Sequence, residues 1–330
     1  MNERLKTICD RLISNRDTVK SAFKWETGIM ELTGAAVLSA EDTEPDVQKL
    51  KECEKIIKSE TSVFSNFRNH IKIPLICKMS ASADPEKYFE NVRNAYSILK
   101  KTSLSGSEYT AMAALTIADT ASEDSYEKYA LKTEEIYKRM KKDHRWLTSS
   151  EDVPFAALLA LSDNETDALI EDANRNYDIL KKSFSSKNSV QSLSHTLALA
   201  DQLPEAKCAK AVTISEALKK ANHPFGTYYE LALLGSLAMI TASSEEITEY
   251  IIEADDYLKE HKGFGNFVLG SKERRMFAAQ CVLLLYRTEC IDVNNVLVNS
   301  MINIAISIEL CLLICASASV AAANAAAASN

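Results

Sequence analysis

The chain has 330 residues, 46% of them hydrophobic, and a formal net charge of −8. A chain of this length exceeds what one compact core usually holds, so two domains or an elongated repeat array is expected. Its 8 glycines and 6 prolines are too few for the turns of a β-sandwich or barrel, which favours helices. The basic residues are dispersed within an acidic chain, so we expect no nucleic-acid partner.

Residues 1–60 are predicted to hold an N-terminal helix and the first helical hairpin. The first residues open an amphipathic helix and lack the apolar run of a signal peptide. The polar residues Asn15, Arg16 and Asp17 indicate a break before the next helix. The 8 cysteines form no Cys-x-x-Cys pair and lie mostly among apolar neighbours, which favours buried thiols in a cytoplasmic protein.

Residues 61–260 are predicted to form five further hairpins, because a unit of roughly 40 residues recurs along the chain. In each unit a helix rich in Ala and Leu precedes an amphipathic helix. The amphipathic helices begin with capping or acidic residues and Pro, and they end in an apolar pair followed by a basic residue. Their last apolar residues are Ile57, Leu99, Tyr137, Leu180, Leu218 and Leu258. The predicted fold is therefore all-α, with tandem helical hairpins forming an α/α superhelix (solenoid) or an α/α toroid in a single domain, 1–330.

Residues 261–330 are predicted to form a terminal hairpin and an apolar C-terminal helix. The Gly-rich segment 261–270 fits a helix end and a turn, because no strand precedes it. Residues 293–328 lack Lys and Arg, and Glu309 interrupts their apolar run, which disfavours a membrane-spanning tail. We expect this end to cover the core or to form a homodimer contact through the C-terminal helix.

No catalytic signature, cofactor motif or metal-ligand pair is present, so the sequence predicts no catalytic residue, cofactor or metal. Three groups of polar residues are candidate binding residues. His144 and Asp152 flank Trp146 in a connection between hairpins, and connections on a rigid scaffold often carry function. Asn188, Gln191 and His195 share one helix face by their i, i+3, i+7 spacing. Arg274 lies in the basic run that opens the last hairpin.

Each group also fits a purely structural role. The connection that holds His144 can be a capped turn on which Trp146 packs. Asn188 can cap its helix while His195 is hydrogen-bonded in the core, and the basic run around Arg274 can be a solvated helix start.

Several segments resemble an uncharacterised bacterial family, the domain of unknown function DUF4003. They are residues 23–26, 144–152, 188–195 and 265–276, and the resemblance extends over nearly the whole chain. It implies a cytosolic bacterial protein without an assigned activity, and it supplies no catalytic residues.

Three functions remain open from the sequence. A protein- or peptide-binding or scaffolding module is favoured, because helical arrays present long concave surfaces and an acidic surface suits a basic partner segment. An all-α enzyme or small-molecule binder would need the six candidate residues to converge from several hairpins. A peripheral membrane protein held by its C-terminal tail is the third.

Overall fold

The computed structural model describes residues 1–225, 229–265, 269–291 and 314. Within these ranges the chain forms α-helices and short 3-10 helices without a strand, so the predicted all-α class is confirmed. The α-helices are α1 (Glu3–Ala22), α2 (Gly28–Ala40), α3 (Val47–Glu60), α4 (Lys72–Ala81), α5 (Pro85–Leu99), α6 (Glu108–Thr120), α7 (Tyr126–Asp143), α8 (Val153–Ala160), α9 (Thr166–Leu180), α10 (Lys187–Leu197), α11 (Pro204–Lys220), α12 (Tyr229–Ala238), α13 (Ser244–Lys259) and α14 (Ser271–Ile291). The 3-10 helices are η1 (Asn66–Arg68), η2 (Glu123–Ser125) and η3 (Ser150–Asp152).

The chain divides into two compact units. The first unit comprises Asp17–Glu171 together with Ile314. The second comprises Met1–Arg16 and the described residues from Asp172 to Ile291. One division falls inside α1 and the other inside α9, so both helices are shared between the units.

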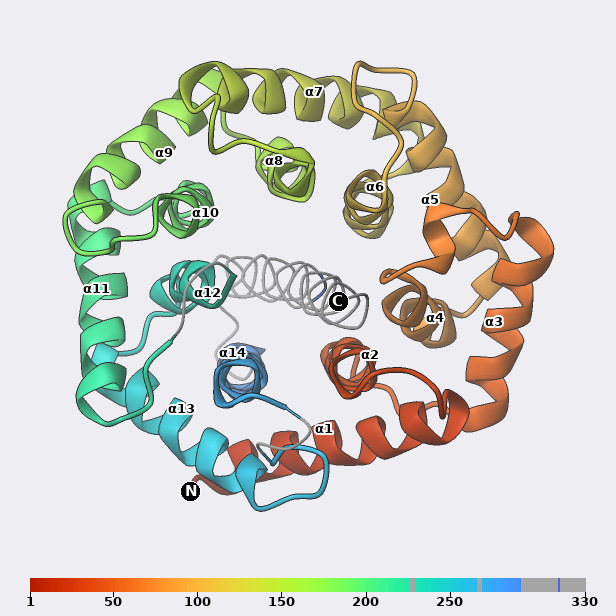
Figure 1. Ribbon diagram of the computed structural model, residues 1–330, viewed down its shortest axis with the longest axis horizontal. Helices are drawn as coiled ribbons and strands as arrows, with labels where there is room; N and C mark the ends of the chain where they lie inside the picture. Colours follow the sequence, from red (N-terminus) through yellow and green to blue (C-terminus); the bar gives the residue numbers. More distant parts are fainter. Residues whose placement is uncertain (226–228, 266–268, 292–313, 315–330) are drawn as a thin grey trace, which may run out of the picture. The chain divides into compact units, whose positions relative to one another are not determined.

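In the first unit, nearly apolar helices alternate along the chain with amphipathic ones. Figure 1 views α4, α6 and α8 along their axes and α3, α5 and α7 from the side, so the two sets cross as two layers. Every residue of α8 is buried, whereas α5 buries one stripe formed by Phe89, Val92, Ala95 and Leu99. This difference follows from composition, because α8 contains no charged residue, whereas α5 carries charged residues on its exposed face.

The amphipathic helices begin at the capping residues that the sequence indicates. The Asp46 and Asp84 carboxylates accept the backbone N–H groups of Lys49 and Lys87 at 2.8 and 2.9 Å, at the starts of α3 and α5. These bonds satisfy N–H groups that have no partner inside the helix.

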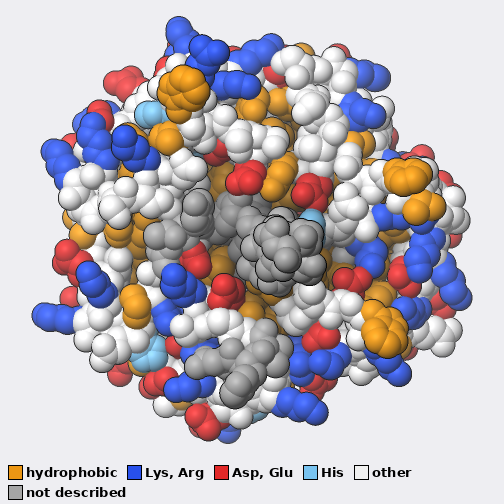
Figure 2. Space-filling view, in the orientation of Figure 1, with side chains coloured by type: hydrophobic (Ala, Val, Ile, Leu, Met, Phe, Trp, Pro, Cys, Tyr) orange, Lys and Arg blue, Asp and Glu red, His pale blue; other side chains and the backbone are white. Residues whose placement is uncertain are grey.

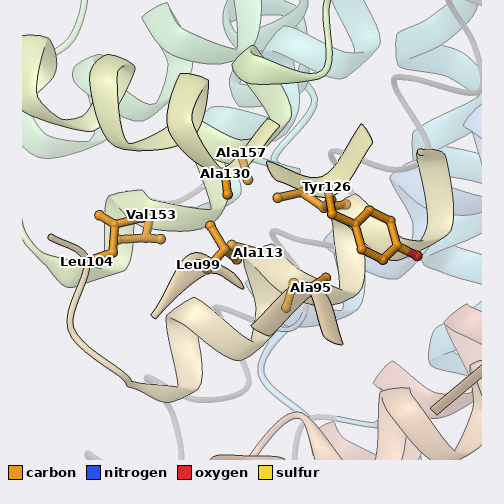
Figure 3. Close-up of a cluster of buried hydrophobic side chains, with 10 residues drawn as sticks. Ala95, Leu99, Leu104, Ala113, Tyr126, Ala130, Val153 and Ala157 are labelled. Atoms are coloured by element: carbon orange, nitrogen blue, oxygen red, sulfur yellow. The ribbon is translucent and has the colours of Figure 1, made fainter. Parts of the chain in front are cut away.

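Small side chains let the two layers of the first unit approach closely. Figure 3 shows a buried cluster to which α5, α6, α7 and α8 all contribute. Ala95, Ala113, Ala130 and Ala157 supply its small side chains, and the ring of Tyr126 is its largest member. Alanines at crossing points shorten the distance between helix axes, and they make up much of this cluster.

The second unit packs α10 on α12, α11 on α12 and α13, and α13 on α14. At the contact of α10 with α12, a Cβ added to Gly235 would lie 2.5 Å from a methyl carbon of Thr196, so the helices meet at a glycine. The first sixteen residues belong to this unit: the Tyr257 hydroxyl donates a hydrogen bond of 2.6 Å to Asp10.

Two local predictions are wrong. No break occurs at Asn15, Arg16 and Asp17, because α1 runs unbroken to Ala22 and both Asn15 and Arg16 are buried. Helix α7 also continues past Tyr137 to Asp143. Local polarity suggested a boundary in each case, but neither segment contains Gly or Pro to end a helix.

Two other predictions concern the cysteines and the C-terminus. Cys9, Cys53, Cys77, Cys208 and Cys281 are free and buried, as expected. The predicted C-terminal helix and its homodimer contact lie in 293–328, which falls outside the described residues except at Ile314.

Candidate functional site

The connection between α7 and α8 holds the first predicted group. His144 is half-buried, whereas the Trp146 side chain is 93% exposed, with the Arg145 guanidinium 5.9 Å from its ring centre. The buried Asp152 carboxylate accepts the Ser149 N–H at 2.8 Å and completes a capping box at the start of η3, directly before α8. Asp152 therefore fixes the backbone of the connection while Trp146 projects from it.

The Asp152 carboxyl has a shifted pKa. Burial raises the pKa of its carboxyl to about 7 and nearby Glu151 adds to this, although the hydrogen bond from Ser149 lowers it. A carboxyl that titrates near neutral pH is suited to proton transfer in many active sites. In this protein the Asp152 carboxylate accepts a hydrogen bond from the backbone N–H of Ser149 in its own turn, which is a structural role.

The second group lies on α10. Gln191 and His195 are buried in the second unit, whereas Asn188 is exposed one turn earlier. Ser186 caps this helix by accepting the Ser189 N–H, so the proposed cap at Asn188 is wrong. The three side chains share a helix face as predicted but do not share one environment.

Arg274 belongs to a buried charge network in the second unit. Its Nε donates to Asp255 at 2.7 Å and its Nη1 donates to the Phe264 carbonyl at 3.2 Å. The Arg275 Nε lies 3.4 Å from the same carboxylate, and the His223 Nδ1 lies 3.0 Å from it. Both arginines are buried, so the solvated helix start is wrong here.

This network is structural in character. It joins α13 to the start of α14 and to the connection that holds Phe264. Burial lowers the pKa of the Arg275 guanidinium, against the opposing effect of Asp255. A buried ion pair adds little net stability by itself, but removal of one member leaves an uncompensated charge.

The sequence did not reveal a groove between α3 and α5 of the first unit. It consists of two adjoining depressions of about 430 and 700 Å³ that share Ile56 and Glu86. Apolar atoms of Cys53, Ile56 and Phe89 contribute to its lining.

Carboxylates predominate among the charged residues of this α3–α5 groove. The acidic lining residues are Asp46, Glu52, Glu60, Asp84, Glu86 and Glu90, and the basic ones are Lys49, Lys55, Lys87 and Arg93. Arg93 is held by Glu60 at 3.1 Å, and Lys87 by Glu90 at 3.0 Å. A groove lined by a few apolar side chains and by a majority of carboxylates among its charged groups is suited to an amphipathic segment that carries basic side chains.

The described part of the chain contains no cluster of three or more His, Cys, Asp or Glu side chains that could hold a metal ion. In that same part, no helix combines the length and apolar character needed to cross a membrane.

The profile of DUF4003, a protein family of unknown function, matches residues 15–310, so the chain belongs to this family. It is similar to the uncharacterized protein YeaA of Bacillus subtilis (strain 168), with 23% identity over 255 residues, 74% of this chain and 75% of the relative. No solved structure matches the chain.

Proposed function

We propose that this protein is a protein- or peptide-binding module, and that its α3–α5 groove receives a basic, amphipathic segment of the partner. The α/α superhelix or toroid expected from the sequence belongs to the same proposal. It is supported by the alternation of buried and amphipathic helices along both units, which is how helical arrays build extended binding surfaces.

The observation that carries the proposal is the position of Glu86. Its side chain lines both depressions of the groove, in the first turn of α5. Ile56, which also lines both depressions, adds an apolar side chain to the groove. A basic side chain of the partner would meet Glu86, and an apolar one would contact Ile56, which is the pattern of a helix bound in a groove.

The test uses a fluorescein-labelled amphipathic peptide rich in lysine and leucine, with a glutamate-and-leucine peptide of the same pattern as its counterpart. Binding to the full chain is followed by fluorescence anisotropy. The lysine peptide should bind and the glutamate peptide should not. Glu86→Lys should weaken binding of the lysine peptide about tenfold, or ~1.4 kcal/mol, because it reverses a charge at the rim.

Glu246→Lys is the matched control. Glu246 also lies in the first turn of a helix, α13, so both substitutions remove the same favourable interaction with a helix N-terminus. Glu246 does not line the groove. Equal losses in the two variants, or equal binding of the two peptides, would contradict the proposal.

A further inference from the structure

Three aromatic side chains of the first unit project almost completely into solvent. Trp25 is 98% exposed, Phe64 is 97% exposed and Trp146 is 93% exposed. They lie in the connections that lead into α2, α4 and α8, respectively. The chain has only 2 tryptophans, and each lies in a connection that leads into a buried helix.

These connections lie on one face of the first unit, because contacts join the starts of successive buried helices. Lys72, at the start of α4, pairs with Glu26 in the connection before α2. His70, just before α4, pairs with Glu108 at the start of α6 at 2.8 Å. The Tyr109 hydroxyl of α6 donates to Glu151 before α8 at 3.4 Å. We call this surface the aromatic face.

The connections into α3, α5, α7 and α9 lie at the other ends of the buried helices. There the Lys78 ammonium pairs with Glu41, after α2, and with Asp119, at the end of α6. All charged residues in these connections are acidic: Glu41, Asp42, Glu44, Asp46, Asp84, Glu123, Asp124, Asp163 and Glu165.

The aromatic face has a different balance of charge. Its connections carry the basic residues Lys24, Arg68, Lys100, Lys101 and Arg145 against the acidic residues Glu26, Glu151 and Asp152, of which Asp152 is buried and Glu26 is paired with Lys72. Lys24 precedes Trp25 and Arg145 precedes Trp146, so each tryptophan has a cationic neighbour in the chain. The first unit is therefore polarised: the charged residues in the connections of one face are all acidic, whereas basic residues outnumber acidic ones beside the exposed aromatics of the other face.

Hydrogen bonds hold the connections of the aromatic face in place. The Arg68 guanidinium donates to the carbonyl oxygens of Lys58 and Thr61, on either side of the end of α3, and so shapes the loop that presents Phe64. In the Trp146 connection, the Thr148 hydroxyl donates to the Met140 carbonyl at 3.1 Å. Ordered loops that expose aromatic tips lose little conformational entropy when those tips are buried by a ligand.

We propose that the aromatic face binds the surface of a bilayer containing anionic lipids. Tryptophan prefers the headgroup level of a membrane, where its ring is buried and its N–H remains solvated. Lysine and arginine beside it are attracted to anionic headgroups. The polarity of the first unit fits this occupant, since the acidic face is then turned away from the negative lipids.

The spacing of the aromatics favours a flat surface over a protein partner. Protein interfaces concentrate their aromatic anchors at one well-packed centre. On the face seen in Figure 2, hydrophobic side chains of the first unit stand as separate patches among polar atoms. A bilayer can receive several separated tips at once without a complementary shape, as in proteins that lie on the membrane without spanning it.

Tryptophan fluorescence provides the readout, because the chain has only 2 tryptophans and both are exposed on the aromatic face. The full-length protein is titrated with vesicles of phosphatidylglycerol and phosphatidylcholine while tryptophan emission is recorded. A blue shift that grows with vesicle concentration is expected, together with protection from acrylamide quenching. Vesicles of phosphatidylcholine alone should produce a much smaller shift, and added salt should weaken binding to the anionic vesicles.

Two variants test the residues while keeping both tryptophans. Phe64→Ala and the double variant Lys100→Glu with Lys101→Glu should each lower the vesicle partition coefficient on the order of tenfold. All three positions are exposed, so the fold should tolerate the changes. Leu131→Ala, on the exposed side of α7, is the matched control and should leave partitioning unchanged.

No shift with anionic vesicles would overturn the inference. So would an equal shift with neutral vesicles, or a blue shift that depends on protein concentration without vesicles, which would instead indicate a second copy of the chain. The outcome is independent of peptide binding in the α3–α5 groove, since none of these substitutions touches a residue that lines it.

Discussion

Arg274 and Asp255 form a buried ion pair in the second unit, with the guanidinium Nε 2.7 Å from the carboxylate oxygen. Asp255 also faces His223 and Arg275, so one carboxylate serves three basic side chains. It therefore anchors the start of α14 to α13.

Arg274→Ala should lower the free energy of unfolding by about 3 kcal/mol, because it breaks a buried pair and leaves the Phe264 carbonyl without this donor. Urea denaturation would measure the loss. Arg175→Ala is the control: its pair with Glu205, at 3.5 Å, is exposed and should contribute less than about 1 kcal/mol. Equal effects would mean that the buried network does not stabilise this unit.

Gly263 adopts a φ of +95°, and a Cβ added there would lie 2.2 Å from the Arg16 guanidinium carbon. Gly263→Ala should therefore destabilise the protein by about 1–3 kcal/mol, through both backbone strain and this clash. Gly265→Ala in the same connection is the control, since a Cβ there meets nothing within 4 Å. Thermal unfolding would compare the two, and equal melting temperatures would contradict the role of Gly263.

Tyr257 should titrate late. Its hydrogen bond to Asp10 and, secondarily, burial raise the pKa of its hydroxyl to about 12. The stabilisation from this bond is present below the unfolded pKa of about 10 and is lost as the pH rises through the folded value. Tyr257→Phe should remove one phenolate transition near pH 12 from the ultraviolet absorbance titration. If Tyr257→Phe instead removed a transition near pH 10, the ordinary value for tyrosine, the hydrogen bond to Asp10 would be contradicted.

Asp152 should make stability fall with rising pH. Its folded pKa, raised from 3.8 to about 7 by burial, means that the folded state binds more protons than the unfolded state between these values. This contribution to stability is present below the unfolded pKa and is lost as the pH rises through the folded one. Asp152→Asn, which keeps an acceptor for Ser149, should therefore gain stability relative to the native protein as the pH rises through this range. A constant difference across the range would contradict the raised pKa.

Local chemistry made much of the fold predictable. Residues such as Asp46, Asp84 and Pro204 mark helix starts, and apolar stripes such as Val92, Ala95 and Leu99 mark buried faces. These signals depend on neighbours within a helical turn, so one sequence suffices to interpret them. The absent break at Asn15 shows the limit, since tertiary burial there overrides local polarity.

The candidate sites were less predictable, because they depend on contacts between distant helices. Arg274 was selected as a polar residue at a helix start, and its burial depends on Asp255, on a different helix. The groove needs Ile56 of α3 and Glu86 of α5 to line one depression. The sequence marks the acidic start of α5 but not the separation of the two helices that opens the groove.

The most direct test of the proposed binding function is to locate a bound peptide. The lysine-and-leucine peptide would carry a photoreactive group at its centre, be irradiated in complex with the full chain, and be mapped by mass spectrometry. The account predicts cross-links in α3 and α5, around Ile56 and Glu86, that Glu86→Lys diminishes and Glu246→Lys does not. Cross-links confined to other helices would contradict it.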